Sequence, residues 1–388
     1  MLSTNDGSSV LSAYQIDCIV GARPNLMKIA PILRAFTAND RVKARLIHTG
    51  QHYDDSMSGI FFEELGIRPP DINLDVGSGT NTEQTARIML ALEPVLASSR
   101  PDMLLVVGDV NSTLAASLVA SKLLIPVVHV EAGLRSNDRT MPEEINRLVV
   151  DRVSDLLLTT DQAANEQLIR EGVDGDQVHF VGNVMIDTLL ANVKHCRPVL
   201  ETIAKYSSGA FKDVCERKGY GIVTLHRPSN VDEPAQLKGL VEALVDISER
   251  LPLIFAMHPR TRARIEQGEL DGQLSAAQIL VTPPLGYIEM IGLMKGARLA
   301  ITDSGGVQEE TTALGVPCLT VRDNTERPVT VAEGTNTLVG SSPNTLRDAA
   351  FSALSNPGKR GRIPDLWDGQ SAERVTDHVI AYLDHNRS

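Results

Sequence analysis

The sequence predicts an α/β protein of two domains, each built on a parallel sheet, and three observations lead to this fold class. The chain has 388 residues, whereas a single hydrophobic core usually stops growing at roughly 250 to 300 residues. Short apolar runs of strand length alternate with stretches of helical periodicity, which is typical of parallel sheets covered by helices on both faces. Distinctive polar residues follow five of these runs, at the positions where open parallel sheets bind ligands.

The first series of apolar runs defines the strands of an N-terminal domain, which we expect to cover residues 1–186. Residues 21–25 should form a loop, and residues 26–36 a helix that tolerates Pro31 near its start. Thr80 and Glu83 have the spacing of a capping box, which predicts a helix reaching Leu96. The runs expected to form strands are residues 16–20, 45–48, 103–107, 127–130, 156–158 and 178–181.

A second series of runs predicts a C-terminal domain over residues 187–370. Its first part, up to residue 220, is helical and charged without strand signals, so the domain boundary is placed at its start. The last helical stretch, within residues 371–388, is expected to pack on either domain. The strands of this second domain are expected at residues 222–225, 253–257, 278–281, 299–302 and 318–321.

Composition and charge exclude several classes of protein. With 42% hydrophobic and 22% charged residues the chain is an ordinary globular protein. Its net charge of −12 argues against a sequence-independent grip on nucleic acid, although one or two cations suffice for a phosphorylated small molecule. No secretory signal or apolar run near 20 residues is visible, so we expect a cytoplasmic protein without a membrane partner. The four scattered cysteines are expected to be reduced thiols.

A phosphate site is predicted where the run at residues 299–302 ends. Ser304, Gly305 and Gly306 open a helical stretch, and a helix N-terminus carries about half a positive charge that attracts anions. Asp303 or Ser304 could instead be an ordinary N-cap, but two glycines permit a close backbone approach that a cap does not need. Cations for the same anion are Arg23 and Lys28, although each is equally explicable as a surface residue. Residues 21–24 do not form the glycine-rich fingerprint of a dinucleotide site.

Candidate acid–base residues lie in loops after neighbouring strands. Asp109, Glu131 and Glu143 or Glu144 come from the first domain, and His226 comes from the second. Carboxylates brought together in a cleft acquire separated pKa values, which allows one to act as acid and another as base. Each taken alone is better explained as a helix cap or as an ion-pair partner of one of the nearby arginines Arg135, Arg139 and Arg147, and their concentration at strand ends is what favours catalysis.

No metal and no cofactor is expected. His129, His226 and His258 lack the spacing of known metal sites. No D-x-D pattern offers a place for Mg²⁺ on a diphosphate either. Protein groups should therefore neutralise the phosphates of a ligand.

Eight ordered strings between residues 18 and 340 resemble the non-hydrolysing UDP-N-acetylglucosamine 2-epimerases. The strings are GARP at Gly21, HTGQHYD at His48, GDVNSTLA at Gly108, HVEAGLRS at His129, MPEEINR at Met141, LHRP at Leu225, TDSGGVQEE at Thr302 and RDNTERP at Arg322. The resemblance implies the glycosyltransferase-B fold, in which two Rossmann-like domains face a central cleft. It also implies a homodimer and a UDP-sugar substrate.

The activity implied by the resemblance is the reversible inversion of C2 between UDP-N-acetylglucosamine and UDP-N-acetylmannosamine. The family eliminates UDP to give a 2-acetamidoglucal and then adds UDP again. The matching catalytic positions are Asp109, Glu131, Glu143 and His226. The matching substrate-binding positions are Arg23, Lys28, Leu285, Met290, Ser304, Gly305, Gly306, Glu310 and Arg327, with Glu310 expected on the ribose hydroxyls.

Some residues depart from the family pattern. Asn25 stands where the family has Glu or Gln, and Leu285 and Met290 replace polar and aromatic residues of the stretch that lines the uracil. Gln51 and His52 resemble part of a regulatory site that senses substrate in some bacterial members. Asp54 departs from that site, which argues against allosteric activation here.

Alternative functions differ in what they require of the site. An epimerase of the same family acting on a UDP-2,3-diacetamido uronic acid would need an additional cation near the sugar. A glycosyltransferase of the same fold would need an acceptor groove and no carboxylate set at C2. A nucleotide-sugar sensor would lack the acid–base residues, all of which are present in this sequence.

Overall fold

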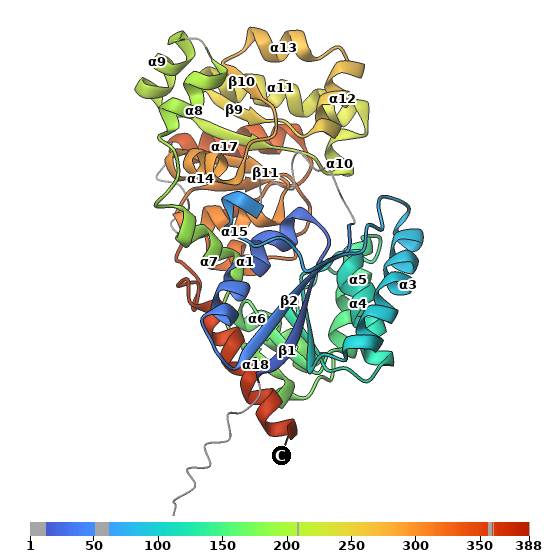
Figure 1. The fold of residues 1–388 in the computed structure, drawn as a ribbon. Coiled ribbons are helices and arrows are strands. Elements are labelled where there is room, and N and C mark those ends of the chain that lie inside the picture. The colour runs from blue at the N-terminus through green and yellow to red at the C-terminus, as the bar shows by residue number, and fades with distance from the viewer. Residues whose placement is uncertain (1–12, 51–61, 208, 356–358, 360, 388) are drawn as a thin grey trace, which may run out of the picture.

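The computed structural model describes residues 13–50, 62–207, 209–355, 359 and 361–387. It contains two parallel sheets, one formed by the first half of the chain and one by the second (Figure 1). The predicted α/β class is therefore confirmed. The position of the domain boundary at residue 187 stays a prediction.

The first sheet has seven strands in the order β3-β2-β1-β4-β5-β6-β7. Its order reverses between β1 and β4, so loops after these strands diverge and leave a ligand site at the carboxyl edge. The strands are β1 (Tyr14–Val20), β2 (Val42–His48), β3 (Ile72–Asn73), β4 (Met103–Val107), β5 (Val127–Ala132), β6 (Leu156–Thr159) and β7 (Val178–Phe180).

Helices cover both faces of this sheet. One face packs under α1, α7 and α18, while α3, α4 and α5 pack together on the other face (Figure 1). Their bounds are α1 (Arg23–Thr37), α3 (Asn81–Ser99), α4 (Asn111–Lys122), α5 (Pro142–Val153), α6 (Gln162–Arg170), α7 (Val184–Asn192) and α18 (Ser371–Arg387).

The second sheet has six strands in the order β10-β9-β8-β11-β12-β13. Its strands are β8 (Gly221–Thr224), β9 (Leu253–Ala256), β10 (Ile279–Thr282), β11 (Leu299–Thr302), β12 (Cys318–Thr320) and β13 (Asn336–Leu338). Its helices are α8 (Val199–Tyr206), α9 (Gly209–Lys218), α10 (Pro228–Val231), α11 (Pro234–Arg250), α12 (Pro259–Gln267), α13 (Asp271–Ala276), α14 (Tyr287–Gly296), α15 (Gly305–Leu314), α16 (Pro328–Ala332) and α17 (Pro343–Ser355).

The structure confirms some predictions of local structure and contradicts others. The capping box is confirmed, because Thr80 Oγ1 accepts from the Glu83 amide at 3.2 Å and Glu83 Oε2 accepts from the Thr80 amide at 3.0 Å. The loop expected at residues 21–25 is wrong, because α1 already begins at Arg23. Pro24 suits the first turn of a helix, and the Asn25 side chain binds the Ala22 amide and the Val107 carbonyl. Strands β3 and β13 are too short to give a sequence signal.

The C-terminal helix returns to the first half of the molecule. Val375, Val379 and Leu383 of α18 are buried, and the helix contacts α1, α7 and β6. The Ala372 amide donates to Asp187 of α7 at 2.7 Å. Just before α18, Trp367 donates through Nε1 to the Thr160 carbonyl at 3.0 Å. The chain therefore crosses between the halves twice, after α7 and again before α18.

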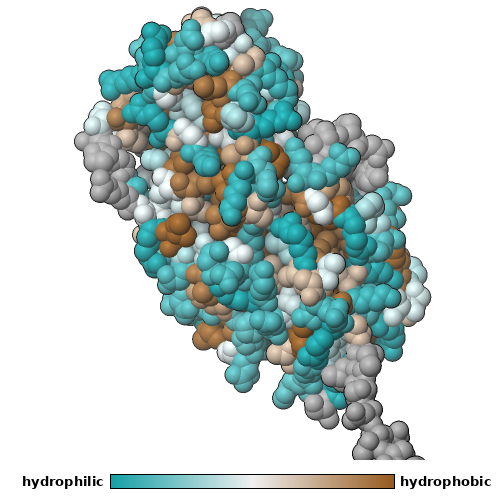
Figure 2. Space-filling model, turned by 60° about the vertical axis from the view of Figure 1, so that its left-hand side comes forward, coloured by the Kyte–Doolittle hydropathy of each residue, from teal (hydrophilic) through white to brown (hydrophobic). Residues whose placement is uncertain are grey.

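Two further features of the described residues bear on function. None of their helices is long and apolar enough to cross a membrane. The face shown in Figure 2 is mainly hydrophilic, and its hydrophobic side chains form groups separated by hydrophilic residues.

Two leucines of α3 should contribute very differently to the free energy of unfolding. Leu92 is fully buried, whereas Leu90 is 73% exposed. We expect Leu92→Ala to destabilise the protein by about 2–5 kcal/mol and Leu90→Ala by less than about 0.5 kcal/mol. Urea denaturation followed by circular dichroism measures both, and equal midpoints would contradict this packing of α3.

Candidate functional site

The candidate site lies where the carboxyl edges of the two sheets meet. Residues after β1, β4 and β5 of the first sheet face residues after β8, β11 and β12 of the second. At its centre Lys28 of α1 donates to Glu131 Oε2, and Arg327 from the second half donates to Glu131 Oε1. All three side chains are buried. One carboxylate thus joins two predicted phosphate-binding cations from opposite halves.

The backbone around Glu131 is shaped for this contact. The pairing of β5 with β6 shifts register between Val130 and Ala132, so a bulge turns Glu131 out of the regular strand. Glu131 has a φ of 75°, a strained conformation for a residue with a side chain. Gly108 has no side chain to obstruct the ion pair, and a Cβ there would lie 2.7 Å from Lys28 Nζ.

Electrostatics keep Glu131 ionised. Burial raises the pKa of its carboxyl group, but Lys28 and Arg327 outweigh burial and hold the pKa below its usual value. The same contacts act on Arg327, because Glu309 and Glu131 raise its pKa in spite of burial. The pKa values of Glu131 and Arg327 therefore depend on one another.

Two other predicted carboxylates of the first half share the partner Arg147. Asp109 binds Arg147 of α5, which also binds Glu144 at 2.7 Å. Glu144 in addition accepts from the Ser136 and Asn137 amides, so it holds the loop after β5 in place. Glu143 is exposed. Of the two alternatives, Glu143 is the one available to a ligand and Glu144 is engaged in structure.

His226 is placed by Asp303. Its Nδ1 lies 2.9 Å from Asp303 Oδ1, and the amides of His226 and Arg227 both donate to Asp303 Oδ2 at 2.9 Å. Burial raises the pKa of the Asp303 carboxyl group, but His226 and these amides bring it below the usual value. The His226 side chain is 41% exposed, so its other ring nitrogen is free to meet a substrate.

The N-terminus of α15 contains the three residues predicted to bind phosphate. Ser304 is the N-cap residue, but its side chain makes no capping bond, and Asp303 is turned toward β8 instead. Gly305 leaves room for Glu326, since a Cβ there would lie 2.7 Å from Glu326 Oε1. Gly306 lies close to Met185 of α7. Ser304 therefore does not act as a side-chain cap, and the phosphate site stays a prediction.

Two consecutive glutamates of α15 are buried. Burial raises the pKa of Glu310 to about 8, with a further contribution from Glu309 and an opposing one from Tyr287. Burial likewise raises the pKa of Glu309. Tyr287 of α14 faces Glu310, and burial and that carboxyl group raise its pKa as well.

The remaining predicted residues are less closely defined. Leu285 is buried just before α14 and Met290 is half-buried within it, next to the Tyr287 and Glu310 pair. Arg23 is the first residue of α1, but its side chain lies outside the described part. Gln51 and His52 lie outside the described residues.

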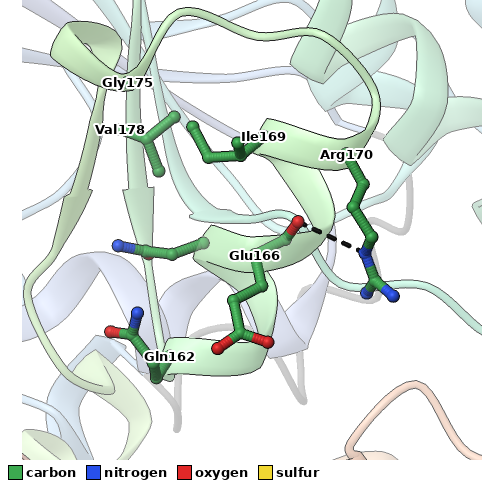
Figure 3. A pocket seen from close by; sticks show the side chains of 7 residues that line it. Gln162, Glu166, Ile169, Arg170, Gly175 and Val178 are labelled. Carbon is green, nitrogen blue, oxygen red and sulfur yellow. Dashed lines mark hydrogen bonds between the residues drawn. The ribbon is translucent and has the colours of Figure 1, made fainter.

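A surface pocket lies away from the candidate site. Its volume is about 480 Å³, and it is lined by residues of α6 together with Gly175 and Val178. Figure 3 shows the side chains of Ile169 and Val178 next to one another, and Arg170 donating to the Glu166 carbonyl. None of the sequence-predicted site residues lines this pocket, so it does not belong to the candidate site.

Sequence reasoning missed several residues that build the site. Arg147 was considered only as a partner, while Glu309, Glu326, Arg322 and Asn183 received no role. Arg322 binds Glu326 at 2.7 Å, and Arg327 and Arg322 hold the pKa of Glu326 far below its usual value in spite of burial. Charged residues are normally placed at the surface, so only their presence within the matched strings signalled the arginines and glutamates, and no sequence signal identified Asn183. No group of three or more metal-binding side chains occurs among the described residues.

Known proteins resemble this chain over nearly its full length. A profile of the family described as UDP-N-acetylglucosamine 2-epimerase matches residues 34–380. The UDP-N-acetylglucosamine 2-epimerase of Methanocaldococcus jannaschii is 43% identical over 95% of this chain and 99% of its own. Its crystal structure with UDP-GlcNAc and UDP has a TM-score of 0.83 at 41% identity, covering 95% of this chain and 99% of that one.

A relative of different specificity is almost as similar. The UDP-2,3-diacetamido-2,3-dideoxy-D-glucuronate 2-epimerase of Pseudomonas aeruginosa is 39% identical over 93% of this chain and 98% of its own. The solved structures confirm the expected glycosyltransferase-B arrangement of two Rossmann-like sheets.

The buried Glu310 should make stability depend on pH. Its pKa is 4.5 in an exposed chain and about 8 in the folded protein, so folding takes up a proton between these values. Stability should therefore fall as pH rises from 5 to 8, by at most about 1.4 kcal/mol per pH unit for this group. Melting temperatures of the ligand-free protein should fall less steeply in Glu310→Gln than in wild type. The exposed-site control Glu166→Gln should follow wild type, and parallel curves for all three would contradict the prediction.

Proposed function

Because this chain belongs to the UDP-N-acetylglucosamine 2-epimerase family, we propose that it interconverts UDP-N-acetylglucosamine and UDP-N-acetylmannosamine. The observation that carries the proposal is the buried contact of Glu131 with Lys28 and Arg327. It brings a potential base next to cations suited to a diphosphate. The M. jannaschii structure with UDP-GlcNAc and UDP supports the choice of substrate.

The proposed reaction has two half reactions. In the first, a base removes the C2 proton, the bond from C1 to the UDP oxygen breaks, and a double bond forms between C1 and C2. In the second, the UDP oxygen attacks C1 again and a proton is delivered to the opposite face of C2. We assign these proton transfers to Asp109, Glu131, Glu143 and His226, which approach the cleft from both halves.

The UDP leaving group needs a stable anion site between the half reactions. We assign the diphosphate to Arg23, Lys28 and Arg327 and to the α15 N-terminus at Ser304, Gly305 and Gly306. The ribose is assigned to Glu310, and the uracil to the stretch containing Leu285 and Met290. A closed cleft would retain the reactive glucal and exclude water.

A second candidate substrate is a UDP-2,3-diacetamido uronic acid. The P. aeruginosa relative supports this alternative. The additional cation that its carboxylate requires is available in principle from Arg322, whose Nη1 is buried without a hydrogen-bond partner in the described part of the chain. Turnover of this substrate in preference to UDP-N-acetylglucosamine would select it.

Solvent isotope incorporation tests the proposed reaction. In deuterated buffer without added metal or cofactor, we expect proton NMR to show the anomeric signal of UDP-N-acetylmannosamine and loss of the C2 proton signal. Incorporation follows because the removed proton exchanges with solvent before it is returned. Epimerisation without deuterium at C2 would exclude the elimination mechanism, and an unchanged spectrum would direct the assay to the diacetamido uronic acid.

Glu131→Gln separates catalysis from binding. Loss of the carboxylate should reduce kcat by roughly 10² to 10⁴, the usual contribution of a general acid–base group. UDP should bind at least as tightly as to wild type, because Lys28 and Arg327 lose their neutralising partner. Calorimetry and the NMR assay measure the two effects, with Glu166→Gln as a surface control. Weaker UDP binding together with unchanged kcat would assign Glu131 to the binding site alone.

A further inference from the structure

Glu309 is a buried carboxylate of the candidate site that has no assigned role. It lies on α15 between Asn183, the N-cap residue of α7, and Arg327. Asn183 Nδ2 donates to Glu309 Oε1 at 2.9 Å, and Arg327 Nε lies 2.7 Å from the same oxygen. All three side chains are buried. The three residues, called the Arg327 support here, bring together both halves of the chain.

Only one of the two carboxylate oxygens of Glu309 has partners. Oε1 meets both partners, whereas Oε2 is buried without a hydrogen-bond partner among the residues described. A buried carboxylate with an unsatisfied oxygen is destabilising, and burial raises the pKa of Glu309 accordingly. An apolar side chain of similar volume would stabilise the fold at least as well as this carboxylate, so stability alone does not explain Glu309. Its placement is explained instead by what Oε1 does to Arg327.

The guanidinium of Arg327 is a rigid plane, so one contact at Nε restricts the direction of its two terminal nitrogens. In this structure Nη2 donates to Glu131, whereas Nε and Nη1 are buried without a hydrogen-bond partner within the described ranges. The contact of Nε with Glu309 Oε1 is therefore an ion pair at 2.7 Å. A guanidinium with unused donors is suited to bind an incoming oxyanion. The orientation set at Nε therefore decides where those donors point.

We propose that Glu309 is a positioning residue, held by Asn183, whose Oε1 orients the guanidinium of Arg327 toward the diphosphate of a UDP-sugar. The inference rests on the proposed UDP site and adds Glu309 and Asn183 to it. Neither residue touches the substrate in this scheme. Their effect on binding passes entirely through Arg327.

A pair of neutral variants isolates the orienting oxygen from the charge. Glu309→Gln keeps an oxygen able to meet Asn183 and Arg327, whereas Glu309→Leu has similar volume and no acceptor. We expect UDP to bind Glu309→Gln with nearly wild-type Kd and Glu309→Leu roughly tenfold to a hundredfold more weakly, as found for residues that orient metal ligands. KM for the UDP-sugar should follow the same order, with a smaller change in kcat. Equal Kd values for the two variants would overturn the proposal.

Asn183→Ser provides an independent test if Glu309→Leu fails to fold. Serine preserves the N-cap of α7 but is too short to reach Glu309. We expect a several-fold higher Kd for UDP, and no further increase when this change is added to Glu309→Leu, because both act through Arg327. Unchanged UDP binding in Asn183→Ser would contradict the role of Asn183 and overturn the Arg327 support.

Asp187→Asn is the matched control for a general loss of stability. Asp187 is a buried carboxylate of α7 that binds the Ala372 amide rather than Arg327. This variant should lower the melting temperature while leaving Kd for UDP unchanged. Calorimetry with UDP on the full chain also separates the two proposals. If wild type binds UDP but does not epimerise, the proposed function fails while the comparison of Glu309 variants still tests the positioning role.

Discussion

The buried ion pair between Glu131 and Arg327 is the interaction on which the rest of the site depends. It crosses from the first half of the chain to the second, and Lys28 completes it from α1. Removing one partner of such a pair leaves an uncompensated buried charge, which typically costs about 3–5 kcal/mol. The strained backbone of Glu131 and the missing side chain of Gly108 are both explained by the need to bring these groups together.

The charges of the site divide into two groups with opposite behaviour. Glu131 and Glu326 are surrounded by arginine or lysine and remain ionised in spite of burial. Glu309 and Glu310 lie on one helix with less compensation, and burial favours their protonated forms. A UDP diphosphate entering the cleft would compete with Glu131 for the same cations. Under the proposed function, substrate binding and the basicity of Glu131 would therefore be linked by shared partners.

The sequence predicted the fold class, because short apolar runs that alternate with helical stretches are local signals. The same reasoning failed at residues 21–25, where Pro24 and the Asn25 side chain support a helix that begins earlier than apolar periodicity suggests. The residue pattern alone could not choose between Glu143 and Glu144, which differ in the partners that folding brings to them, and only the family resemblance pointed to Glu143. Glu309 and Asn183 are separated by 126 positions, and no local pattern connects them.

The double crossing of the chain constrains how the halves can move. The second crossing ends beside α7, since Gly182, which precedes α7, lies against the Leu366 carbonyl, and Gly369 lies against Leu190 of α7. A chain that passes between the halves twice ties them together at two points. Any separation of the halves must therefore displace both connecting segments, and their return would bring Arg327 back to Glu131.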